Sequence, residues 1–397
     1  MAVGIYISGL EHATNNETVE KYAARYVKEL ENATFDNCYY TKIEKIYYTT
    51  NQSSLVIHIF EHPKNTDKSD TDKLVYKLYD FEYSEQLNHN FQNKNLLFKN
   101  SSLLLLVIRR FPRLIINLFK KSTYQKGGKT ACMFIIFLIM SLAVLSVLPL
   151  LLLSLDNTFT VENLATLGSK SNLNLIIKYG IILTVTFMLF MPESNIILTK
   201  IAAEFFTMDS YIQSKKQIHR VKHNLEELMA FIVTQEGNEK IHFHTYSFGS
   251  IIALDTLFPI DSEPSKNIKN QVNLLVTIGA PYEFVTNYYP HFLENRNDQM
   301  TKKIQWINVY SLVDAFASNF RYDNKAGEAN FGILNKQETP ININYEITQK
   351  TDYYVFDFLG LKQTYMHESY WDDSNNGQSC TKLIFFKMRE IGQWSAA

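Results

Sequence analysis

Cysteine, glycine and proline are all scarce in this sequence, and each scarcity removes a class of protein. The three cysteines, Cys38, Cys132 and Cys380, are widely spaced, which argues against a disulfide framework or a cysteine-based metal site. With only 14 glycines and 9 prolines among 397 residues, and 14% aromatic residues, the chain is not of the disordered kind. A net charge of -1 also argues against a nucleic-acid partner.

A basic leader is missing too. The chain opens on a short apolar run, Ala2 to Ile7, rather than on the positive and apolar regions of a secretory signal. Together with the unpatterned cysteines, this favours a catalytic part that stays in the cytoplasm.

The middle of the chain contains two long apolar runs. Residues 131–155 contain no charged residue, and residues 173–191 contain only Lys178, near the start of the run. Because about 20 apolar residues in a helix cross the hydrocarbon core of a bilayer, we expect two transmembrane helices. A buried hairpin in a soluble protein is the alternative for each run.

A strongly basic stretch precedes these runs. Residues 94–129 hold nine basic and no acidic residues, whereas the link 156–172 holds one lysine and two acids. The positive-inside rule then predicts a multi-pass protein with both termini and the catalytic part in the cytoplasm. Within the stretch, apolar residues of 103–121 recur at near-helical spacing, which predicts an interfacial helix for anionic lipid headgroups. A solvated basic face packed on the soluble domain is the alternative.

Strand and helix patterns alternate on both sides of this middle region, which predicts an α/β fold with a mostly parallel sheet and helices on both faces. We expect strands at 3–7, 42–49, 54–60, 74–81, 240–246, 272–278 and 303–310, and helices at 16–30, 210–233 and 250–257. The chain is therefore divided into the first part of one domain (1–90), a membrane insertion (91–205) and the second part of that domain (206–397).

A serine, Ser247, stands where the strand at 240–246 passes directly into a helix. Such a turn strains the serine backbone, lifts Oγ clear of the sheet and needs small residues two positions away. Gly249 meets this requirement, whereas the branched Thr245 stands where glycine is usual. The first N–H groups of the helix, beginning with Phe248, could bind an oxyanion. An ordinary N-capping serine is the alternative.

A nucleophilic serine needs a base and an orienting acid. In chains with such a turn, the acid follows the serine in the sequence and the histidine follows the acid. His367 lies late enough in the sequence, whereas His291 comes early. Asp314 follows the predicted strand 303–310, and its competitors are Asp255, Asp261, Asp323, Asp352 and Asp357. A packed core histidine and a helix-capping aspartate are the alternative roles for His367 and Asp314.

Two further histidines, His242 and His244, alternate along the predicted strand 240–246. No cluster of additional ligands accompanies them in the sequence, so we expect neither a metal ion nor any other cofactor.

Four segments in sequence order resemble α/β-hydrolases of the lipase and esterase type: 245–255, 276–281, 306–310 with Asp314, and 367–371. The start of the helix before the serine, Asp209-Ser210-Tyr211, is similar as well. The resemblance implies Ser247 as nucleophile, Asp314 as acid and His367 as base.

The same resemblance implies an oxyanion loop at the end of the first strand, where the N–H of Gly9 or Leu10 would join that of Phe248. The family usually has His-Gly at this place, and the sequence has Ser8-Gly9. Ser8 and Thr245 are thus two departures from the strict motif.

These features lead us to expect a membrane-anchored serine hydrolase that cleaves carboxylic esters, of lipid or acyl type, through an acyl-enzyme. The lipid substrate follows from the membrane region and not from pocket residues. An acyltransferase, in which an alcohol replaces water, stays open, as does a catalytically degenerate scaffold for membrane recruitment or signalling.

Overall fold

The computed structural model describes the two ends of the chain and only part of its middle. The residues described are 2–10, 18–34, 37–64, 72–83, 87, 102–116 with gaps, 205–237, 239–260, 262–311, 314, 316–321, 329–330, 333–334, 340–345, 367–371 and 379–394. The chain divides into one unit of residues 1–85, 121–127 and 214–397 and a second of residues 86–120 and 128–213. The boundaries predicted after residues 90 and 205 differ from these by five and eight residues, and the prediction did not separate residues 121–127 from the insertion.

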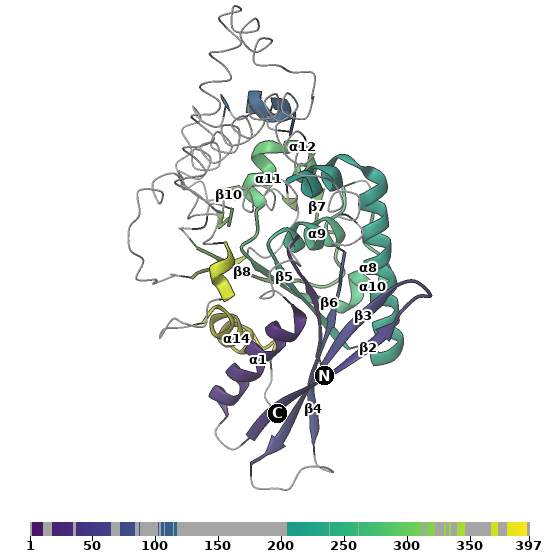
Figure 1. Ribbon diagram of the computed structural model, residues 1–397, viewed down its shortest axis with the longest axis vertical. Coiled ribbons are helices and arrows are strands. Elements are labelled where there is room, and N and C mark those ends of the chain that lie inside the picture. Colours follow the sequence, from purple (N-terminus) through teal and green to yellow (C-terminus); the bar gives the residue numbers. More distant parts are fainter. Residues whose placement is uncertain are drawn as a thin grey trace, which may run out of the picture. The chain divides into compact units, whose positions relative to one another are not determined.

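An eight-stranded sheet forms the centre of the first unit as far as the chain is described, in the order β12-β8-β6-β5-β1-β4-β3-β2 (Figure 1). Every pairing is parallel except those of β2 with β3 and β3 with β4. The fold is therefore α/β with a mostly parallel sheet, as predicted. The strands are β1 (Ala2–Ile7), β2 (Asn37–Tyr47), β3 (Ser53–Pro63), β4 (Lys73–Asp80), β5 (Lys240–Tyr246), β6 (Val272–Ile278), β8 (Gln305–Tyr310) and β12 (Ile341–Asn344).

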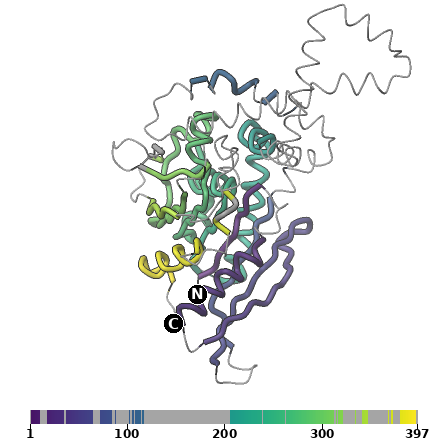
Figure 2. The backbone as a smooth tube through the Cα atoms, turned by 60° about the vertical axis from the view of Figure 1, so that its left-hand side comes forward, coloured from purple at the N-terminus to yellow at the C-terminus, as the bar shows by residue number. Residues whose placement is uncertain are grey.

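Helices cover both faces of this sheet (Figures 1 and 2). One face carries α1 (Val19–Ala33) and α14 (Cys380–Glu390), and the other carries α8 (Lys215–Glu236), α9 (Phe248–Leu257) and α10 (Lys266–Gln271). In α1, the buried side chains recur at helical spacing, and all of them except Glu29 are apolar or aromatic residues that face the sheet. The smaller elements are α11 (Tyr282–Tyr288), α12 (Pro290–Leu293), β7 (Arg296–Asn297), β9 (Phe320–Arg321), β10 (Ala329–Asn330), β11 (Ile333–Leu334) and the 3₁₀ helix η2 (Glu368–Trp371).

The strands β5 and β6 have the bounds that the sequence predicted. The single helix predicted at 210–233 is wrong, because helical residues 205–213 end before Ser214 and α8 begins after it. Ser214 has an extended backbone, and its hydroxyl accepts a hydrogen bond from the N–H of Gln217. This is the geometry of an N-cap, which separates two helices that apolar periodicity alone would join.

The chain leaves β1 and β5, two adjacent parallel strands, in opposite directions across the sheet. Strands β2 to β4 lie on the β1 side, and β6, β8 and β12 lie on the β5 side. Ligands of open α/β sheets bind at the carboxyl ends of strands at such a switch point. Ile7 pairs with Thr245, so Ser8 and Ser247 both lie just beyond this edge of the sheet.

A buried polar network fixes β5 against α1 and β4. The ring nitrogens of His244 lie 2.9 Å from the hydroxyl of Tyr22 and 2.8 Å from that of Tyr76. The Tyr76 hydroxyl also lies 3.1 Å from Nδ1 of His242. Burial lowers the pKa of His242 to about 3 and that of His244 well below its usual value, so both are neutral near pH 7. The two histidines that alternate along β5 are thus packed, hydrogen-bonded core residues.

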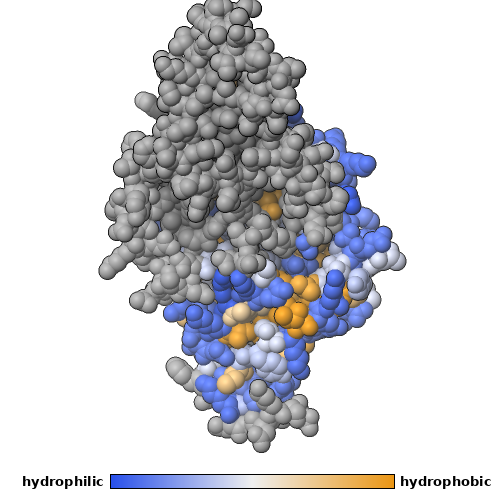
Figure 3. All heavy atoms as spheres, in the orientation of Figure 1, coloured by the Kyte–Doolittle hydropathy of each residue, from blue (hydrophilic) through white to orange (hydrophobic). Residues whose placement is uncertain are grey.

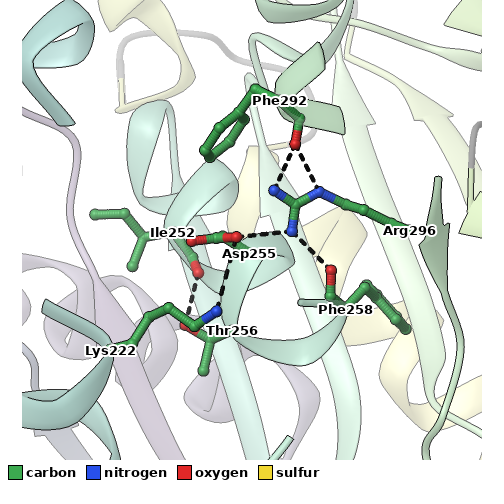
Figure 4. Close-up of polar contacts among 7 residues, drawn as sticks. All are labelled: Lys222, Ile252, Asp255, Thr256, Phe258, Phe292 and Arg296. Carbon is green, nitrogen blue, oxygen red and sulfur yellow. Dashed lines mark hydrogen bonds and ion pairs between the residues drawn. The ribbon is translucent and has the colours of Figure 1, made fainter. Parts of the chain in front are cut away.

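A buried ion pair holds the far end of α9 (Figure 4). The guanidinium of Arg296 is 2.7 Å from the carboxylate of Asp255 and 2.7 Å from the carbonyl oxygen of Phe258. Its Nε and second terminal nitrogen donate to the carbonyl oxygen of Phe292, at 3.0 and 2.6 Å. Because α9 begins directly after Ser247, this cluster anchors the helix that carries the serine turn.

The described surface in the view of Figure 3 is largely hydrophilic, with apolar atoms emerging in limited areas. On the first unit, the exposed large apolar side chains that the structure describes are Ile43, Tyr47, Ile260 and Phe386. Isolated residues of this kind are ordinary for a folded domain.

The two predicted transmembrane runs, 131–155 and 173–191, lie outside the described residues. Among the helices that are described, none is both long and apolar enough to cross a bilayer.

Replacing Arg296 tests the anchoring of α9. The substitution Arg296→Met removes the 2.7 Å partner of the buried Asp255 carboxylate and leaves only Lys222, at 3.8 Å. Because the buried charge is then poorly compensated, we expect the free energy of unfolding to fall by about 3–5 kcal/mol. Urea unfolding followed by circular dichroism measures the change. The control Lys387→Met removes an exposed ion pair with Glu390 and should cost less than about 1 kcal/mol. Equal losses in the two variants would contradict the anchoring role.

Candidate functional site

The backbone of Ser247 is strained. Its φ of 50° and ψ of -125° lie outside the regions that residues other than glycine normally occupy. Hydrogen bonds on both sides hold this conformation: Ser247 N–H donates to the Ile278 carbonyl at 2.8 Å, and Ser250 N–H donates to the Ser247 carbonyl at 3.0 Å. Although Ser247 precedes α9, its side chain makes no capping hydrogen bond. The hydroxyl therefore does not serve the helix, which weighs against the N-cap alternative.

Gly249 makes the sharp turn possible. A Cβ atom at this position would lie 2.3 Å from the carbonyl oxygen of Ile7 and 2.4 Å from that of Ser8. Only glycine allows the first turn of α9 to pack this closely on the end of β1. The Ser8 carbonyl also accepts a hydrogen bond from the Tyr83 hydroxyl at 2.9 Å.

Thr245 has a specific place in the site despite its branched side chain. It is fully buried, and its hydroxyl donates to the carbonyl oxygen of Val276 on β6 at 2.9 Å. Because that proton is used, Oγ1 accepts from the hydroxyl of Ser250 on α9, also at 2.9 Å. The departure from glycine thus adds hydrogen bonds that join β5, β6 and α9.

Three side chains that are far apart in the sequence form one chain of hydrogen bonds. Nε2 of His367 lies 2.7 Å from Oγ of Ser247, and its Nδ1 lies 2.8 Å from Oδ2 of Asp314. The carboxylate is fully buried, and the imidazole is mostly buried. With Nδ1 protonated and bonded to the acid, Nε2 is the acceptor that faces the serine hydroxyl.

The Asp314 carboxylate receives two further hydrogen bonds. The backbone N–H of Phe316 donates to Oδ1 at 2.9 Å, and the Tyr370 hydroxyl donates to Oδ2 at 3.0 Å. Burial, followed by the charge of Asp314, raises the pKa of Tyr370 well above its usual value. Tyr370 therefore stays protonated and remains a donor to the same oxygen that binds His367. In the sequence, Tyr370 is marked only by its position three residues after His367, and that position does not reveal its contact with Asp314.

The imidazole of His367 is enclosed on several sides. Tyr246 stacks on its ring at 5.3 Å between centroids, and the Tyr246 hydroxyl donates to the His367 carbonyl at 2.7 Å. Gly279 has a φ of 62°, and a Cβ there would lie 3.0 Å from Cε1 of His367. The ring of Phe316 meets the imidazole edge-on at 5.4 Å. These contacts support the imidazole in the orientation that places Nε2 toward Ser247.

The competing residues that the structure describes lie elsewhere. His291 is exposed and lies 3.0 Å from Glu294, and Asp255 pairs with Arg296. Asp261, Asp323, Asp352 and Asp357 lie outside the described residues. Within the described ranges, no three histidine, cysteine or acidic side chains cluster as a metal site would require.

The predicted oxyanion donors come from two elements that meet at the edge of the sheet. Gly9 and Leu10 follow the end of β1, and Phe248 is the first residue of α9. The close approach of Gly249 to Ile7 and Ser8 brings these elements together. The binding of an oxyanion by these N–H groups stays a prediction.

Comparison with known proteins gives no match to any family model, curated protein or solved structure. What the site can do must therefore be argued from its own residues.

Removing the Tyr370 hydroxyl tests its role as a positioning residue. In Tyr370→Phe, the Asp314 carboxylate loses a donor and interacts more strongly with a protonated His367. We expect an approximately tenfold lower kcat/KM toward an activated ester, because the carboxylate loses one of the contacts that hold it in line with His367, and misplaced catalytic groups cost rate. The acid limb of the pH–rate profile should move to higher pH.

The control is Tyr26→Phe, because the Tyr26 hydroxyl donates to the sulfur of Met388, away from the triad. This variant should leave the pH profile unchanged. If Tyr370→Phe also leaves it unchanged, the hydroxyl has only a structural role.

Proposed function

We propose that this chain is a serine ester hydrolase of the α/β-hydrolase type. The observation that carries the proposal is the unbroken chain of hydrogen bonds from the buried Asp314 through His367 to a serine held in a strained turn. Strained backbone persists where the surrounding structure maintains it, and it clusters at functional sites. A degenerate scaffold would have no need to keep the strain and all three partners.

The geometry supports the following reaction. Ser247 Oγ attacks the ester carbonyl carbon while His367 Nε2 takes its proton, and Asp314 stabilises the resulting imidazolium. The N–H of Phe248 and that of Gly9 or Leu10 would hold the tetrahedral oxyanion, each donor contributing about 3 kcal/mol to lowering the barrier. His367 then protonates the leaving alcohol. Water, deprotonated by the same histidine, cleaves the acyl-enzyme and releases the acid.

The substrate is proposed to be a lipid or another acyl ester. Aromatic rings support this, because Phe316 lies against His367 and Phe284 packs on Phe316 with centroids 5.6 Å apart. The predicted transmembrane hairpin, 131–155 and 173–191, and the basic stretch 94–129 would hold the chain at a membrane with the catalytic part in the cytoplasm. The proposed chemistry uses the side chains of the triad and no cofactor.

A fluorophosphonate probe tests the nucleophile. Ser247 Oγ should attack the phosphorus and displace fluoride, leaving a covalent label on the wild-type chain. Ser247→Ala should take up no label. The matched control Ser262→Ala changes an exposed serine on a loop and should label like the wild type.

Absence of label on a folded wild-type chain would contradict the enzyme proposal. Where labelling succeeds, incubation with an acyl ester in the presence of an alcohol acceptor separates the two enzyme classes. A free acid as main product supports the hydrolase, and a new ester as main product would replace it with an acyltransferase.

A further inference from the structure

The helical residues between 102 and 116, in the second unit, carry an exposed apolar stripe. Leu105 is 67% exposed and Ile108 is 55% exposed, which is unusual for side chains of this size. At 3.6 residues per turn the members of the stripe lie on one side of the helix. We call these residues the apolar stripe: Leu105, Ile108, Phe111, Ile115 and Ile116.

The opposite side of the same helix attaches it to its unit. Leu106 is buried, and the guanidinium of Arg110 forms an ion pair with the Asp209 carboxylate at 2.6 Å. Arg109 lies at the border between the two sides, is exposed, and donates to the side-chain oxygen of Gln213 at 3.4 Å. Because these contacts fix which side of the helix faces inward, the outward direction of the apolar stripe follows from the fold of this unit.

Positive charge borders the apolar stripe. Arg109 and Arg113 are exposed beside it, and the sequence from residue 90 to residue 130 contains no acidic residue. An apolar helix face bordered by arginines is the composition of helices that lie in the headgroup region of anionic bilayers. A protein partner would need acidic and apolar groups in a matching pattern, whereas an anionic bilayer supplies both over any area.

We propose that the apolar stripe docks on the surface of a bilayer that contains anionic lipids, with Arg109 and Arg113 among the headgroups. The apolar side chains enter the boundary between headgroups and acyl chains, and the arginines bind phosphate and carboxylate groups there. This surface is distinct from the predicted transmembrane runs. It rests on exposed residues of the second unit and is independent of the proposed ester hydrolysis.

A fluorophore on the apolar stripe tests the proposal in the full chain. The label is attached to Ile108→Cys after the three native cysteines are replaced by alanine, and the protein is reconstituted into phosphatidylcholine vesicles with or without phosphatidylserine. With phosphatidylserine, we expect a nitroxide lipid to quench the label and aqueous iodide to quench it little. The matched control is Ile43→Cys on the edge strand β2, which should stay open to iodide.

Charge removal gives a second result. The double variant Arg109→Gln with Arg113→Gln should lower the ratio of docked to undocked chains by about fivefold per charge. Hydrogen exchange on the unmodified chain serves where the labelled variants do not fold. In that measurement residues 102–116 should exchange more slowly with phosphatidylserine than without it.

Two outcomes would overturn the proposal. In the first, iodide quenches the label at position 108 as strongly as the label at position 43 in vesicles with phosphatidylserine. In the second, the label at position 108 is protected from iodide but the nitroxide lipid does not quench it, which would mean that another protein or a second copy of the chain covers the apolar stripe. Failure of either kind leaves the reactivity of Ser247 untouched, so the two proposals fail separately.

Discussion

The close approach of Gly249 to the end of β1 is the constraint on which the rest of the site depends. Since Gly249 has no Cβ, α9 can begin against the carbonyl oxygens of Ile7 and Ser8. The chain must then reverse direction within one residue after β5, and Ser247 takes the positive φ that this reversal demands. The same contact brings the end of β1, with Gly9 and Leu10, beside the start of α9. The proposed nucleophile and the proposed oxyanion loop are thus two results of one packing contact.

A strained turn costs on the order of 1–3 kcal/mol and needs support from its surroundings. Contacts of β5 and α9, the two elements that flank Ser247, supply this support. Thr245 joins β5 to β6 and α9 through its hydroxyl, and Arg296 holds the opposite end of α9. On the other face of the sheet, the neutral His244 fixes β5 to α1 and β4. These contacts explain why polar residues lie in so apolar a core.

Much of this arrangement could be predicted from local sequence, and the failures have physical reasons. The apolar runs of β5 and β6 and the serine between strand and helix are local patterns, and the order of Ser247, Asp314 and His367 pointed to partners that the structure brings together. The hydroxyl of Tyr370 on Asp314 and the partners of Thr245 could not be predicted, because those contacts join distant positions. The helix break at Ser214 was not predicted, because apolar residues recur at helical spacing on both sides of it and the cap depends on a single hydroxyl group.

The central claim is that Ser247 becomes acylated during turnover. The most direct test is mass spectrometry of the full chain after rapid acid quenching from a reaction with an activated acyl ester, followed by peptide mapping. The account predicts a transient mass increase equal to one acyl group, located on Ser247 and absent when Ser247 is replaced by alanine. Turnover without this adduct, or an adduct on another residue in a folded and active chain, would contradict it.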